Sequence, residues 1–226
     1  MKLNKPSVIK ETMIESFEFY GASIVASTPK PKYLMSFSTG GLFINESVEL
    51  AALHRESEAW KVTLGRAIEC GLATLPKAAS KRRTLREITN RISCLSAIER
   101  EFLISEADRQ EQQAVLWLAT CRAYRFIHEF AVEVVRERHL SWRLELGPEA
   151  FDVFFGAKAE WDGGLAAISK STQQKLRQVL YRMMREAGLL SEDGHIQTVY
   201  LSPRLKSLIV QADPDGLEVF PGGDSG

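Results

Sequence analysis

The feature that most constrains the fold is an apolar pattern with helical spacing that continues from Asp108 to about His139. A stripe of this kind gives a helix one face that must be buried against other elements. We therefore predict one long central helix around which the rest of the chain packs. Its apolar positions are Val115, Leu118, Ala119, Ala123, Phe126, Ile127, Phe130, Val134 and Val135.

Shorter patterns of the same period flank this helix on both sides. The fold class that they indicate is mainly α, a helical bundle around the central helix. At most a small hairpin is expected near residues 189–200. The further predicted helices lie near residues 42–55, 58–70, 80 or 84 to 95, 97–104, 148–161, 171–187 and 201–211.

We predict four regions along the chain. Residues 1–32 form an N-terminal extension or linker, because the prolines in the run "STPKPK" favour extended backbone. Residues 33–145 form a helical N-terminal domain. Residues 146–212 form a C-terminal subdomain that is helical and resembles a winged helix. Residues 213–226, which are rich in Gly, Pro and Asp, form a flexible tail.

Charged side chains interrupt the apolar pattern too often for a helix that crosses a membrane. Four charged residues and one histidine lie between Val115 and Val135, whereas a span needs about 18 or more uncharged apolar residues. The first nineteen residues carry six charges and so lack the apolar region of a signal peptide. We therefore predict a cytoplasmic protein without a membrane segment. Three isolated cysteines fit that compartment as reduced thiols.

No motif in the sequence argues for catalysis. The phosphate-binding Gly-x4-Gly-Lys pattern is missing, and the four histidines and three cysteines show no spacing typical of metal ligands. The acidic residues near 99–108 are typical of a solvated helix end. We therefore predict a protein that is not an enzyme, has no cofactor and takes no small-molecule substrate.

Two local clusters of positive charge stand out in a chain whose net charge is zero. Residues 77–91 contain six cationic residues and one carboxylate, a local charge of +5. Residues 171–206 contain six cationic and three acidic residues, a local charge of +3. Such segregation is typical of a surface that binds phosphates. Two ordinary solvated helix faces would give the same counts.

The stretch "STQQKLRQVLYRMMREAGLLSEDGHIQ" predicts an amphipathic helix with Ser171 as its N-cap and Gly188 after its last turn. Asp193-Gly194 then predicts a tight hairpin. A helix followed by a hairpin matches the recognition helix and wing of a DNA-binding domain, with 148–161 as the supporting helix. The Gln and Arg side chains on its polar face can contact base edges. Winged helices that bind protein share this pattern, as do helix–hairpin pairs that bind nothing.

The candidate DNA-binding residues come from both clusters. They are Lys81, Arg82, Arg83, Arg86, Thr172, Gln173, Gln174, Lys175, Arg177, Gln178 and Arg182.

The chain also resembles the BrxA family of the bacteriophage exclusion (BREX) defence systems over roughly residues 33–221. The resemblance is carried by "YLMSFSTGGL", "WLATCRAYRFIHEFAVEVVRE", "FDVFFGAKAEW", "STQQKLRQVLYRMMREAGLL" and "LSPRL". It implies a non-enzymatic, cytoplasmic protein with a NusB-like helical bundle. It also implies binding to double-stranded DNA and action alongside other BREX components, a methyltransferase among them.

Three hypotheses follow for the function. The first is an accessory protein that binds duplex DNA, mainly through phosphates. The second is an adaptor whose basic clusters dock an acidic surface of the defence complex. The third, binding to RNA, rests only on the similarity of fold.

Overall fold

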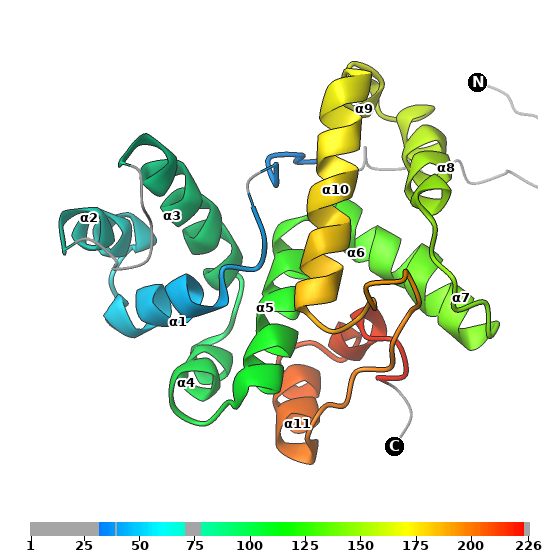
Figure 1. Cartoon of the computed structure of the whole chain (residues 1–226). Helices are drawn as coiled ribbons and strands as arrows, with labels where there is room; N and C mark the ends of the chain where they lie inside the picture. The colour runs from blue at the N-terminus through cyan, green and yellow to red at the C-terminus, as the bar shows by residue number, and fades with distance from the viewer. Residues whose placement is uncertain (1–31, 39, 71–77, 224–226) are drawn as a thin grey trace, which may run out of the picture. The chain divides into compact units, whose positions relative to one another are not determined.

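Helices make up most of the computed structural model, which describes residues 32–38, 40–70 and 78–223, without the side chains of 78–81 (Figure 1). The prediction of a mainly α bundle is confirmed. The predicted extension at 1–32 falls almost wholly outside the described residues, and the division at 145/146 stays a prediction. The segments are α1 (Ile44–Leu53), α2 (Trp60–Cys70), α3 (Ala78–Ile92), α4 (Ala97–Ser105), α5 (Arg109–Ala123), α6 (Arg125–Phe130), η1 (Ala131–Arg136), α7 (Glu137–Leu140), α8 (Pro148–Ala159), α9 (Gly163–Ala166), α10 (Lys170–Glu186), α11 (Pro203–Ala212) and η2 (Gly216–Val219).

The predicted central helix is present but is not continuous. It begins at a capping box in which Asp108 and Glu111 each accept the other's backbone N–H, at 2.9 and 3.0 Å. Residues 114–121 of α5 are all buried, as expected for a helix surrounded by others. The helix breaks at Tyr124, whose backbone is extended (φ −129°, ψ 97°), and a turn of π-helix, η1, follows α6.

The break at Tyr124 coincides with a buried polar network. The Tyr124 hydroxyl donates to both carboxylate oxygens of Glu87 on α3, at 2.6 and 2.7 Å. Arg91 donates from Nε to the same carboxylate and from Nη1 to the carbonyl of Gly41, each at 2.9 Å. Burial and the hydrogen bond to Glu87 raise the pKa of Tyr124 to about 12, so its hydroxyl stays protonated and keeps donating.

A segment outside the helices, described at residues 33–38 and 40–43 and called the 33–43 segment, crosses between α3 on one side and α5, α6 and α10 on the other (Figure 1). Phe37 is fully buried, with its ring 5.4 Å from that of Tyr124 and 6.4 Å from that of Phe126. Leu42 donates its backbone N–H to Glu186 of α10 at 2.6 Å. This 33–43 segment therefore joins helices that are far apart in the sequence.

The start of the 33–43 segment is held by a cluster of charged side chains. Tyr33 donates its hydroxyl to Glu129 at 2.5 Å, and Arg125 and Lys158 each pair with the same carboxylate at 2.7 Å. Burial raises the pKa of Glu129, but the hydrogen bonds from Lys158, Tyr33 and Arg125 outweigh it and lower the pKa to about 2.

The helix α10 follows the prediction except at its start. Its N-cap is Ser169, which accepts from the backbone N–H of Thr172, and not Ser171. Gly188 lies after the last turn with φ +73°, as predicted for a glycine at a helix end. The hairpin turn that contains Gly194 (φ +86°) is present, but the bridge that pairs its two arms, Leu190–Ile196, is an isolated one. No strand occurs in the described residues.

The C-terminal tail differs from the prediction of a flexible end as far as it is described, to residue 223. Its short 3-10 helix η2 is followed by Phe220, and both Val219 and Phe220 are buried. Trp117 of α5 donates its indole N–H to the carbonyl of Val219 at 3.0 Å. The tail is rich in Gly and Pro, and this composition gave no sign that Val219 and Phe220 complete the core around α5.

We predict that Tyr124→Phe destabilises the protein by about 1–3 kcal/mol, because it removes a buried donor from the Glu87 carboxylate. Urea unfolding followed by circular dichroism measures the change. Tyr200→Phe, at an exposed tyrosine, is the control and should change the free energy of unfolding by less than about 0.5 kcal/mol. Equal effects of the two substitutions would contradict a structural role for the buried hydroxyl.

Glu129 should make stability depend on pH. Its pKa is lowered in the folded state, so its contribution is present above the ordinary value of 4.5 and is lost as pH falls toward about 2. Glu129→Gln should therefore cost about 1–3 kcal/mol at pH 7 and flatten the loss of stability between pH 5 and pH 2. Thermal unfolding across that range tests this, with exposed Glu160→Gln as the control. Parallel pH profiles for wild type and Glu129→Gln would rule it out.

Candidate functional site

The exposed face of α3 carries three arginines, Arg82, Arg83 and Arg86. They point outward because the opposite stripe of the helix, which includes Leu85 and Ile88, is fully buried. Arg83 donates from Nη2 to the hydroxyl of Ser38 at 2.9 Å, a neutral partner. Among the described residues, none of the three arginines pairs with a carboxylate. We call this surface the α3 face.

Not every cation of the 77–91 cluster belongs to the α3 face. Arg91 is only 2% exposed, and Glu87 neutralises its charge within the core. Lys77 and the side chain of Lys81 lie outside the described residues. The local charge counted from the sequence therefore included a buried ion pair that contributes nothing to the surface.

Five of the predicted residues on α10 share one exposed face, which we call the α10 face: Thr172, Gln174, Lys175, Gln178 and Arg182. The other two point to the side, toward α8. Gln173 donates to Asp152 at 3.2 Å, and Arg177 forms an ion pair with the same carboxylate. Asp152 thus withdraws a glutamine and an arginine from the predicted contact surface.

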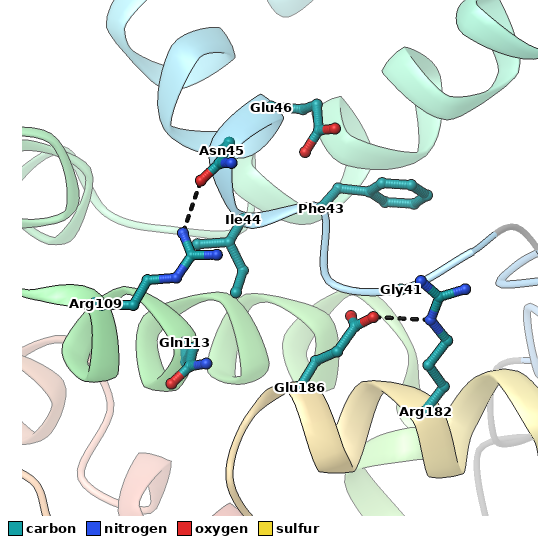
Figure 2. A pocket seen from close by; sticks show the side chains of 9 residues that line it. All are labelled: Gly41, Phe43, Ile44, Asn45, Glu46, Arg109, Gln113, Arg182 and Glu186. Carbon is teal, nitrogen blue, oxygen red and sulfur yellow. Dashed lines mark hydrogen bonds and ion pairs between the residues drawn. The ribbon is translucent and has the colours of Figure 1, made fainter. Parts of the chain in front are cut away.

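Arg182 lies at the edge of a pocket of about 420 Å³ between α1, α5 and α10, shown in Figure 2. Its Nε donates to Glu186 at 2.8 Å, and that carboxylate also accepts the backbone N–H of Leu42. On the far side of the pocket, Arg109 donates to Asn45 at 2.7 Å (Figure 2). Two arginines and two glutamates line this pocket, so its lining carries no net charge. A lining without net positive charge does not favour an anion, and these side chains serve to hold the helices together.

Two further arginines of the 171–206 cluster also lie close to carboxylates. Arg185 lies 3.7 Å from Glu192, and Arg204 lies 3.4 Å from Glu106, the residue after α4. Both Glu106 and Asp152 lie outside residues 171–206, so a count along the sequence could not include them. The α3 face consequently differs from the α10 face in having no carboxylate partner among the described residues.

The 33–43 segment links the two faces. Arg83 contacts it at Ser38 from the α3 side, and Glu186 contacts it at Leu42 from the α10 side. Gly41 lies against Glu186 so closely that a Cβ there would overlap the carboxylate. Ser38 and Asp152 were missed as determinants of these surfaces, because no spacing in the sequence pairs them with the arginines, whereas Glu186 stands four residues after Arg182 on the same helix.

Two features are absent from the part of the chain that the structure describes. No group of three or more His, Cys, Asp or Glu side chains is placed to hold a metal ion. None of the helices in that part of the chain combines the length and apolarity needed to cross a membrane.

Comparison with known proteins gave a family and a fold. The model of the family described as BrxA matches residues 31–213, which include both faces. No curated protein matches the chain. A solved structure, described as an uncharacterized protein from Magnetospirillum magneticum, superposes with a TM-score of 0.67 at 18% sequence identity. The alignment covers 82% of this chain and 96% of that one. At this identity the likeness shows the fold alone.

Proposed function

The chain belongs to the BrxA family of BREX-associated defence proteins, and on that premise we propose that it is a non-enzymatic accessory protein that binds duplex DNA. The observation that carries the proposal is the α3 face, where Arg82, Arg83 and Arg86 lie exposed without a described carboxylate partner. We further propose that the protein acts in the cytoplasm together with other components of the defence system.

The physical basis is the release of counterions from the DNA backbone. Each arginine that neutralises a phosphate frees a condensed cation, so unpaired guanidinium groups on one surface favour binding regardless of base sequence. Lys81 belongs to the proposed contact by its position in α3. An arginine already paired with a carboxylate must break that pair first and so contributes less.

The α10 face is proposed as a second contact. Lys175 and Arg182 would meet phosphates, and Thr172 lies at the helix N-terminus, where backbone N–H groups favour anions. Gln174 and Gln178 can each pair with the edge of an adenine in the major groove. Gln173 and Arg177 join this contact only if they leave Asp152.

We predict that Arg82→Ala/Arg83→Ala weakens duplex binding about tenfold or more and lowers the slope of log affinity against log salt by about two. Arg177→Ala/Arg182→Ala should have a smaller effect, because both arginines are already paired. Fluorescence anisotropy with a labelled duplex at several salt concentrations measures both quantities. Arg55→Ala/Lys61→Ala removes the same charge from other exposed positions and is the control. If both Arg82→Ala/Arg83→Ala and Arg177→Ala/Arg182→Ala kept wild-type affinity, the assigned contact surface would be wrong.

Asp152→Asn should strengthen duplex binding, by about threefold, because it removes a negative charge and releases Arg177 toward the DNA. Glu160→Gln removes a carboxylate just after the same helix without releasing an arginine, and its effect should be smaller. The same anisotropy titration applies. Weaker binding by Asp152→Asn would argue against a contact through α10.

The adaptor hypothesis is favoured by a different observation. Val153 on α8 and Trp161 just beyond its end are 73% and 89% exposed, and large exposed apolar side chains are typical of surfaces that bind protein. Co-purification with tagged defence components, compared between wild type and Trp161→Ser, tests it. RNA binding is tested by competing labelled duplex DNA with RNA of the same length.

A further inference from the structure

Trp142 occupies a backbone position that disfavours a bulky side chain. It follows the end of α7 with φ +56°, and its N–H bonds to the carbonyl of His139 at 3.0 Å while that of Arg143 bonds to Arg138 at 2.9 Å. This is the arrangement in which glycine usually ends a helix, because other residues are strained there. The Trp142 side chain is 86% exposed, so burial does not offset the strain.

Trp142 stands at the edge of a cavity of about 750 Å³, within the usual size range of small-ligand sites. Tyr200, which is 70% exposed, supplies a second aromatic side chain, and Leu144, Ile196 and Leu201 are among the apolar residues of the wall. Two exposed aromatic side chains that do not pack in the hydrophobic core thus line the same cavity.

Three polar side chains also line this cavity: His139, Thr198 and Lys206. The Nε2 of His139 lies 3.0 Å from the Thr198 hydroxyl, while its Nδ1 is buried and has no hydrogen-bond partner. A nitrogen buried in this way is out of reach of a molecule in the cavity, so Thr198 and Lys206 are the polar residues of the lining that a ligand can meet. Gly222 closes the wall, since a Cβ there would come within 2.7 Å of Thr198.

We propose that this cavity binds an unpaired base of a DNA strand. The base would stack on Trp142 or Tyr200, as bases do on aromatic platforms. Its polar edge would bond to the Thr198 hydroxyl, and Lys206, which also lines the cavity, would favour the adjoining phosphate. An apolar peptide side chain would use the aromatic rings but neither polar residue, so a nucleobase with its phosphate fits the lining better. The proposal rests on the DNA-binding function but adds a site distinct from the α3 and α10 faces.

The test compares two labelled duplexes of the same length, one fully paired and one with a single bulged 2-aminopurine. We expect the bulged duplex to bind about tenfold more tightly and its 2-aminopurine fluorescence to fall on binding, because stacking quenches it. Trp142→Gly should abolish both effects. Because glycine adopts a positive φ without strain, the melting temperature of the Trp142→Gly variant should be no lower than that of the wild type. Trp161→Gly, at an equally exposed tryptophan outside the cavity, should keep the preference for the bulge.

The outcomes separate this site from the proposed function. If both duplexes bind equally and depend on Arg82 and Arg83, duplex binding stands and the base site is wrong. If Trp142→Gly retains the preference, the base site is also wrong, and the cavity is better explained as a protein-docking surface. If only the bulged strand binds, in a manner that requires Trp142, the site stands and the proposed duplex contact fails.

Discussion

The rest of the structure depends on how the 33–43 segment is clamped between helices. Arg91 of α3 holds its Gly41 carbonyl, Glu186 of α10 holds its Leu42 N–H, and Phe37 fills the space beside Tyr124. Each contact joins residues at least 50 positions apart. The ion pair of Arg91 with Glu87 is buried, and such pairs are tolerated only when further hydrogen bonds satisfy them. Here Tyr124 and Gly41 supply those bonds.

The clamp also orients the surfaces proposed to bind DNA. Burying Leu85 and Ile88 against the central helix leaves Arg82, Arg83 and Arg86 on the outer side of α3. Packing α8 beside α10 brings Asp152 to Arg177, which divides the polar face of α10 into a paired flank and an open face. Surface charge is therefore a product of packing and not only of composition.

Local patterns predicted the helices well, because an apolar stripe of period 3.6 requires a helix wherever a core is available to cover it. The capping residue and the terminal glycine of α10 follow from equally local rules, although Ser169 took the place expected of Ser171. Errors arose where distant contacts override local preference. The central helix breaks where the Tyr124 hydroxyl reaches Glu87, and the tail is ordered by burial of Val219 and Phe220.

The sequence by itself determined the helical class, the positions of most helices, the family and the residues from which a cationic surface could be made. Only the tertiary structure decided which of those cations face solvent without a carboxylate partner in the described part of the chain, because ion pairs such as Arg177–Asp152 and Arg204–Glu106 form between segments that the chain order separates. The cavity beside Trp142 belongs to the same category. Its wall combines the end of α7, the stretch after the hairpin, the start of α11 and Gly222, which no linear spacing relates.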